Sequence, residues 1–163
     1  MNFRQATIDD IPAVMAIVAE VAQEMAAVGN HQWDVSYPTA ERFERDVDNG
    51  ALYVVDDDGV LGFVTVDHDE PDGYRGLPWT SGDFLVIHRL AVSSRSRGSG
   101  VASFIEASVE EMARSRGARL LKIDTYSTNA GMLSFLFKKG FRKVGEMEFR
   151  GKPLPFYCYE KIL

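Results

Sequence analysis

Apolar residues along this chain follow two different spacings, and the helical spacing is clearest near the N-terminus. Asp9 or Asp10 can cap a helix that has Pro12 in its first turn. After them, apolar residues recur every three or four positions, at Val14, Ile17, Val18, Val21 and Met25. Helix-start signals also precede three later stretches, near residues 39, 99 and 129. The pattern therefore predicts four helices, each burying one apolar face.

Strand-like segments separate these helices. Residues 51–55 and 60–66 are apolar runs joined by a turn that ends in Asp58-Gly59, and an Asp-Gly pair between such runs is a strong hairpin signal. Residues 84–92 are almost continuously apolar, as expected of a central strand. Further strands are predicted over residues 2–7, 119–125, 141–149 and 156–162.

The order of these elements is βααβββαβαββ, which predicts one α/β domain over residues 1–163. A helix connects strand 84–92 to strand 119–125, and a connection of this kind makes a parallel pair. The hairpin at residues 51–66 and the terminal strands favour antiparallel pairing. The fold class expected is a mixed, mostly antiparallel central sheet with helices on both faces.

The composition of the chain restricts the kinds of binding partner that it can have. The 163 residues include 45% hydrophobic and 26% charged residues, which is ordinary for a globular protein. A net charge of −6 argues against nucleic acid and suits a cationic small substrate better. Cys158 is the single cysteine, which favours a reducing cytoplasm. No Cys/His cluster has metal spacing, and no apolar run suits a signal peptide or a membrane span, so we expect a cytoplasmic protein without metal.

A basic turn stands out against this acidic background. It follows strand 84–92, precedes the helix from residue 99, and contains Arg95, Arg97, Gly98 and Gly100. The start of a helix presents unpaired N–H groups and the positive end of the helix dipole, and glycines let the backbone approach a ligand closely. The turn therefore predicts an anion site, and a phosphate is the anion that such junctions bind.

Two phosphate-binding patterns fit this turn incompletely. A Walker-type loop needs a lysine after its last glycine, and none follows Gly100. A dinucleotide fingerprint needs a third glycine where Ser103 stands, although Asp124 lies at a plausible distance for a ribose contact.

A third pattern fits better and extends over most of the chain. Arg95-x-x-Gly98-x-Gly100 after a buried strand resembles the pyrophosphate loop of the GNAT superfamily of N-acetyltransferases. The segments around Asp124, Asn129 and Gly140 are similar to the second half of that family's signature, and the order of elements is similar to that of the family fold. The resemblance implies acetyl-CoA as the cofactor, held in the opening between two splayed parallel strands.

The resemblance also implies cofactor contacts. Backbone groups of Leu90 and Val92 would pair with the pantetheine arm, as in β-strand addition. Asn129 would reach the pantetheine side, and the following helix would flank the cofactor. The whole predicted cofactor-binding set is Leu90, Ala91, Val92, Arg95, Arg97, Gly98, Ser99, Gly100, Val101, Ala102 and Asn129.

The acid–base residues are less clearly marked. The family's usual tyrosine near the thiolate aligns with Leu136, which cannot donate a proton. Tyr126 is the nearest phenol in sequence and is the candidate acid, or else a loop tyrosine with an exposed hydroxyl. His88, in strand 84–92, is the candidate base, with a hydrogen-bonded core histidine as the alternative.

Two further segments are candidates for binding the acceptor amine. In the resembling family the loop between the first two helices lines the acceptor pocket, and here it carries Trp33 and Tyr37. Trp33 could equally be a lid over the core. The acidic stretch at residues 67–72 could attract a cationic amine, but charge runs of this kind are usually solvated surface. Cys158 is expected to be a packing residue.

The function that these observations favour is transfer of an acetyl group from acetyl-CoA to a primary amine of a small molecule, or of a peptide or protein. The amine would attack directly in a ternary complex. Two other functions remain open, a CoA-binding module that has lost the chemistry and a nucleotide-dependent oxidoreductase. The family resemblance further suggests a homodimer through the terminal strands.

Overall fold

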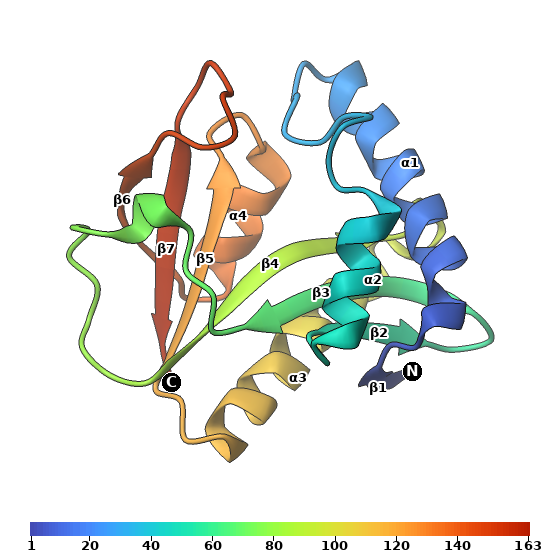
Figure 1. The fold of residues 1–163 in the computed structure, drawn as a ribbon, viewed down its shortest axis with the longest axis horizontal. Coiled ribbons are helices and arrows are strands. Elements are labelled where there is room, and N and C mark those ends of the chain that lie inside the picture. The colour runs from blue at the N-terminus through green and yellow to red at the C-terminus, as the bar shows by residue number, and fades with distance from the viewer. The chain divides into compact units, whose positions relative to one another are not determined.

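The elements form close to where the hydrophobic pattern places them. The structure, a computed structural model, describes residues 1–163 (Figure 1). Its strands are β1 (Asn2–Gln5), β2 (Leu52–Asp56), β3 (Val60–Asp67), β4 (Phe84–Val92), β5 (Leu120–Tyr126), β6 (Arg142–Met147) and β7 (Phe156–Ile162). Its helices are α1 (Ile11–Ala27), α2 (Ala40–Asp48), α3 (Val101–Ser115) and α4 (Ala130–Lys138), with short 3-10 turns η1 (Ile8–Asp10), η2 (Asp72–Tyr74) and η3 (Ser94–Ser96).

All seven strands belong to one sheet with the order β1-β2-β3-β4-β5-β7-β6. The pairs β1–β2, β2–β3, β5–β7 and β6–β7 are antiparallel. The pair β4–β5 is parallel, with register from Phe84 opposite Leu120 to Ile87 opposite Ile123. The predicted element order and the mixed, mostly antiparallel sheet are confirmed. No helix combines the length and apolar composition that crossing a membrane would need.

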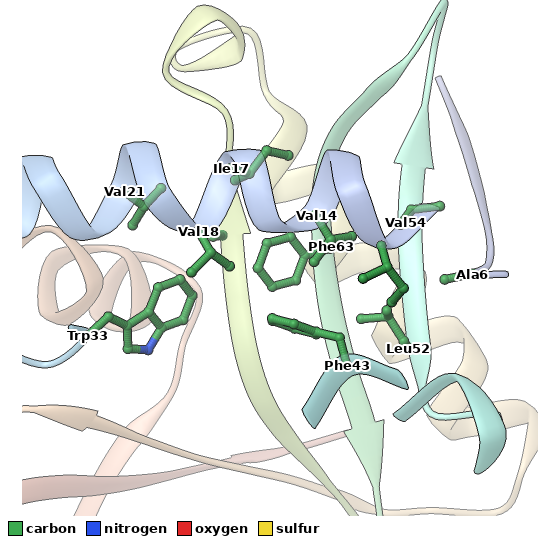
Figure 2. Close-up of a cluster of buried hydrophobic side chains, with 12 residues drawn as sticks. Ala6, Val14, Ile17, Val18, Val21, Trp33, Phe43, Leu52, Val54 and Phe63 are labelled. Atoms are coloured by element: carbon green, nitrogen blue, oxygen red, sulfur yellow. The ribbon is translucent and has the colours of Figure 1, made fainter. Parts of the chain in front are cut away.

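The chain divides into two compact units, and the first comprises Met1–Val66 and His88–Val109. The apolar stripe of α1 forms its core with α2, β2 and β3. Val14 and Val18 point from α1 toward Phe63 and Trp33 (Figure 2). Burial of one such side chain stabilises the fold by about 1.5–3 kcal/mol relative to exposure. The predicted stripe is thus confirmed at Val14, Ile17, Val18 and Val21, which are all buried.

The helices α1 and α2 cover one face of β2 and β3 (Figure 1), and α3 covers the other. Gly62 shows how closely α3 packs there. A Cβ atom at this position would lie 2.9 Å from the carbonyl oxygen of Ala91 and 3.2–3.3 Å from the side chains of Ile105 and Val101. Helices therefore lie on both faces of this part of the sheet, as predicted.

The second unit comprises Asp67–Ile87 and Glu110–Leu163. Its core contains Tyr74, Val86, Tyr126, Met147, Phe156 and Cys158. Residues 68–83, which we call the β3–β4 connection, contribute Tyr74 to this core and Leu77 and Trp79 to its edge. The connection also carries η2, so it is an ordered, packed segment.

Candidate functional site

The turn between β4 and α3 (residues 93–100), called here the β4–α3 turn, has a backbone that only glycine adopts easily at two places. Gly98 has φ +75° and Gly100 has φ +86°, both in the left-handed region. A Cβ atom at either position would meet no atom within 4 Å. The two glycines are therefore needed for the path of the backbone, which runs along an open surface.

This turn also leaves backbone donors unused. Its internal backbone hydrogen bonds run from Ser96 N to Ser93 O at 2.9 Å, from Arg97 N to Ser94 O at 3.2 Å and from Ser99 N to Ser96 O at 3.4 Å, and the first helical bond joins Phe104 N to Gly100 O at 2.9 Å. No acceptor in the chain is bonded to the N–H groups of Gly98, Gly100, Val101 and Ala102. Orphan amides at a helix start are the donors that bind an anion.

Two glutamates of α1 hold the β4–α3 turn in place. Glu20 accepts hydrogen bonds from Ser94 N at 2.8 Å and from Ser93 Oγ at 3.4 Å. Glu24 forms an ion pair with Arg97. Arg95 donates to the carbonyl oxygen of Val60 at 3.4 Å. Sequence reasoning missed both glutamates, because nothing in the spacing of α1 indicates which of its polar residues faces the turn.

The predicted strand residues of the site all lie on β4. Ala91 is buried in the core of the first unit, whereas His88, Leu90 and Val92 are half-buried. The strand register continues into the turn through a hydrogen bond from Ser93 N to Leu61 O at 2.9 Å. The cofactor-binding part of the prediction within the first unit, residues 90–102, therefore forms one continuous strand, turn and helix start.

A buried ion pair that sequence reasoning missed lies beside His88. Arg89 binds Asp46 of α2 in a fork, with Nε to Oδ2 at 3.1 Å and Nη2 to Oδ1 and Oδ2 at 3.0 and 2.9 Å. Asp46 also accepts from Thr65 Oγ1 at 2.9 Å and from Arg42. Burial opposes the charge of Arg89, but the neighbouring Tyr37 and Asp46 outweigh it and raise the pKa of its guanidinium.

The two predicted acceptor residues have different environments. Trp33 is only 5% exposed and stacks on Phe63 with ring centroids 6.3 Å apart. Its burial supports the packing alternative rather than a wall open to substrate. Tyr37 is half-buried, and its hydroxyl accepts a hydrogen bond from Nη1 of Arg89 at 2.7 Å. Tyr37 also packs against the core cluster, but of the two it is the less buried and the one whose polar group is bonded to Arg89.

In the second unit, Asn129 and Tyr126 lie around the end of β5. Asn129 is the N-cap of α4, as predicted, and its Oδ1 accepts from Met132 N at 3.2 Å. Tyr126 is 2% exposed and its hydroxyl accepts from Leu154 N at 3.1 Å. The alternative of a loop tyrosine with an exposed hydroxyl is therefore wrong. Leu136, at the family's tyrosine position, is buried in α4.

The acidic side chains of residues 67–72 are mostly exposed, as their charge run suggested, although one of them also pairs with a buried lysine. Glu70 pairs with the buried ammonium of Lys122 at 2.8 Å, and Trp79 and Phe84 lie 4.7 and 3.9 Å from that ammonium. Glu70, Trp79 and Lys122 border a pocket of about 370 Å³ in the second unit. Tyr74 donates to Asp124 at 2.7 Å, and burial, followed by Asp124, raises the pKa of its phenol.

Comparisons with known proteins agree with this geometry. The sequence model of the Acetyltransferase (GNAT) family matches residues 17–141. A Staphylococcus aureus Mu50 protein assigned as an acetyltransferase is 28% identical, with a TM-score of 0.78 and 99% of each chain covered. A GNAT-family acetyltransferase of Streptococcus agalactiae 2603 is 24% identical, with a TM-score of 0.85 and coverage of 99% of this chain and 95% of that one.

A third solved structure is an N-acetyltransferase of Thermoplasma acidophilum in complex with coenzyme A. It is 12% identical, with a TM-score of 0.75 and coverage of 99% of this chain and 98% of that one, which shows the shared fold. No curated protein sequence matches the chain.

Proposed function

Because the chain belongs to the GNAT family of acetyltransferases, we propose that it transfers an acetyl group from acetyl-CoA to a primary amine in a ternary complex. The acceptor is a small molecule or the amine of a peptide or protein. The family uses acetyl-CoA, and the residues of the β4–α3 turn fit that cofactor. Their orphan amides and open, left-handed glycines are what a pyrophosphate requires.

The orphan amides are the observation that carries the proposal. We propose that the N–H groups of Gly98, Gly100, Val101 and Ala102 bind the pyrophosphate, with Arg95 and Arg97 beside them. Main-chain groups of Leu90 and Val92 align the pantetheine arm, and Asn129 also reaches the pantetheine. When bound, acetyl-CoA supplies the acetyl group as a thioester. The protein's part is then to bind, to orient and to move protons.

Proton transfer falls to His88 and Tyr126 in this proposal. A primary alkyl amine reaches the protein mostly as an ammonium, so a base must remove a proton before the nitrogen can attack. His88 takes that proton, because an imidazole is suited to the task near neutral pH. Tyr126 is the donor to the leaving sulfur, in place of the tyrosine that Leu136 replaces. Alignment alone can supply much of the acceleration, so the reaction does not depend on either residue entirely.

A second candidate is a CoA-binding module without chemistry. The observation that favours it is Leu136, since the apolar side chain removes the proton donor expected on α4. The oxidoreductase alternative has no support from the family match.

We further propose a cytoplasmic protein, from its single reduced cysteine, and a homodimer through the terminal strands.

The test is thiol release from acetyl-CoA in the presence of an amine panel of amino acids, polyamines, aminoglycosides and peptides. We expect release with at least one amine, with the product heavier by one acetyl group in mass spectrometry. Tight CoA binding without release on any amine would instead favour the binding module. Two variants test the residues: His88→Gln should lower kcat while leaving CoA affinity unchanged, and Tyr126→Phe should lower kcat less. Full kcat in both would remove these roles.

A further inference from the structure

The loop between α1 and α2 (residues 28–39), called here the acceptor loop, is held by local contacts and two anchors. Asp34 and Tyr37 exchange backbone hydrogen bonds at 3.1 and 3.2 Å, which closes the tip of the loop. Val35 in that tip is fully exposed. Trp33 anchors the loop to the core by packing near Val18 and Phe63 (Figure 2). The hydrogen bond from Arg89 to Tyr37 is the polar anchor.

The side chain of Arg89 is itself held in place by contacts outside the loop. Its side chain is 8% exposed, and Nε and Nη2 bind both oxygens of Asp46. Asp46 in turn accepts hydrogen bonds from Thr65 of β3 and from Arg42 of its own helix. Because the guanidinium is planar, the fork to Asp46 also fixes the direction of its third nitrogen, Nη1. This nitrogen donates to the hydroxyl of Tyr37. The ion pair therefore fixes a phenol that belongs to a different segment of the chain.

This arrangement orients the phenol as well as the loop. Because Arg89 donates to the hydroxyl oxygen of Tyr37, the hydroxyl hydrogen must point away from Arg89. Tyr37 follows the exposed loop tip, and its partner Arg89 is the residue next to His88. The contact therefore fixes the phenol, and with it the loop, beside the strand that carries His88.

We propose that Arg89, locked by Asp46, is a positioning residue that fixes Tyr37 and the acceptor loop and thereby sets the affinity for the acceptor amine. The inference rests on the proposed function, since it assigns this loop to the amine and the β4–α3 turn to the cofactor. It separates two roles of neighbouring residues on β4. Residues 90 and 92 serve the cofactor through their main chain, whereas residue 89 serves the amine through its side chain.

Steady-state kinetics test the amine side. Arg89→Lys keeps the charge but loses the fork, and Tyr37→Phe loses only the hydroxyl. We expect each variant to raise KM for the amine about tenfold, the scale of one lost hydrogen bond to a charged group, with KM for acetyl-CoA changed less than about twofold. The double variant should be no worse than either single one, because both remove the same contact. Arg42→Lys is the matched control, since Arg42 binds the same carboxylate from within α2.

Amide hydrogen exchange tests the loop without relying on activity. We expect peptides covering residues 28–39 to exchange faster in Arg89→Lys and in Tyr37→Phe than in the wild type or in Arg42→Lys. Unchanged exchange in the first two variants overturns the inference, whether or not any amine is acetylated. Equal rises in KM for both substrates overturn it as well, because a general loss of structure would cause them. Failure of the wild type to acetylate any amine would count against the proposed function alone, and the exchange rates would still decide the positioning role.

Discussion

The two connections that flank β4 are built on opposite principles. The β3–β4 connection, in the second unit, has its polar groups paired, with Tyr74 on Asp124 and Thr80 on Glu160. The β4–α3 turn and the start of α3, in the first unit, leave the amides of Gly98, Gly100, Val101 and Ala102 without an acceptor. Both segments contain glycine and a 3-10 turn, so composition does not separate them. The difference teaches that unused donors, rather than glycine content, distinguish the turn proposed to bind the cofactor from the packed connection.

The glycines of the two segments make the same contrast. Gly73 of the β3–β4 connection is crowded, and a Cβ atom there would lie 2.6 Å from Sδ of Met147. Around Gly98 and Gly100 a Cβ atom would meet nothing within 4 Å. Gly73 is therefore required by a neighbouring side chain, whereas Gly98 and Gly100 are required by the backbone path. Substitutions at the two places should have different consequences.

The largest effect should come from Glu160, which anchors the packed connection. Glu160 is fully buried and accepts from Thr80 N at 2.9 Å, Thr80 Oγ1 at 2.7 Å and Arg142 Nε at 3.0 Å. Glu160→Ala leaves these donors without their acceptor. We therefore expect the free energy of unfolding, measured in urea, to fall by about 3–5 kcal/mol. A loss below about 1 kcal/mol would show that the connection is held by its apolar contacts alone.

The charge of Glu160 also predicts a pH dependence. Burial alone would raise its pKa, but hydrogen bonds from Thr80 and Arg142 outweigh burial and hold the pKa below the ordinary value for glutamate. A lowered folded-state pKa means that this stabilisation is complete above the unfolded-state pKa and is lost as pH falls through the folded-state value. Urea titrations across acidic pH should show this loss in the wild type, and Glu160→Gln should show less of it.

The next effect concerns the open turn. Each non-glycine residue in the left-handed region costs roughly 1–2 kcal/mol, so the double variant Gly98→Ala/Gly100→Ala should distort the amides. We expect CoA affinity, measured by calorimetry, to fall about 30- to 100-fold, which corresponds to roughly 2–3 kcal/mol. Gly117→Ala is the matched control, because Gly117 has φ +77° with equally open surroundings just beyond the other end of α3. It should lose similar stability per residue and keep CoA affinity; equal loss of affinity in the control would refute the contrast.

Gly73→Ala should give the opposite result. The added methyl group overpacks Met147, and such insertions cost typically about 1–3 kcal/mol. We expect a lower melting temperature with CoA affinity unchanged. Gly76→Ala serves as the comparison within the same connection, since Gly76 has φ +78° but no neighbour within 4 Å of a Cβ atom. A loss of CoA affinity in Gly73→Ala would contradict the conclusion that the β3–β4 connection serves packing and the β4–α3 turn serves CoA binding.

The smallest effect should be at Cys158. It lies on β7 opposite Asp124 and is buried, and burial above all raises the pKa of its thiol to about 12. A buried, protonated thiol is a packing group. We expect Cys158→Ala to cost about 1 kcal/mol by removing the sulfur from the core, and to keep kcat. A marked loss of kcat would give this residue a part in the reaction.

Local patterns predicted most of the fold, because each element is encoded within its own segment. The stripe of α1, the Asp58-Gly59 hairpin and the Asn129 cap all depend on residues a few positions apart, and the structure confirms each of them. The orphan amides of the β4–α3 turn were foreseeable for the same reason. Gly98 and Gly100 at a strand-to-helix junction carry the signal within a few residues.

Contacts between distant segments could not be predicted from one sequence. Arg89 lies 43 positions from Asp46, and Tyr74 lies 50 positions from Asp124. Any of several charged or phenolic residues could have made these pairs, and only the folded sheet selects them. For the same reason Trp33 and Tyr37 looked alike as acceptor residues, although one proved to be core and the other a partner of Arg89.

The two arginines and two glutamates at the β4–α3 turn carry formal charges that cancel. Arg95 and Arg97 are offset by Glu20 and Glu24, which hold the turn. The amides act through dipoles that fade within a short distance, whereas net charge acts over a Debye length of about 10 Å at 0.1 M salt. The turn therefore attracts a phosphate only when the phosphate is already close to the amides. The turn itself should then add little ionic-strength dependence to the encounter with a phosphorylated ligand, and long polyanions such as nucleic acids gain no distant attraction from it.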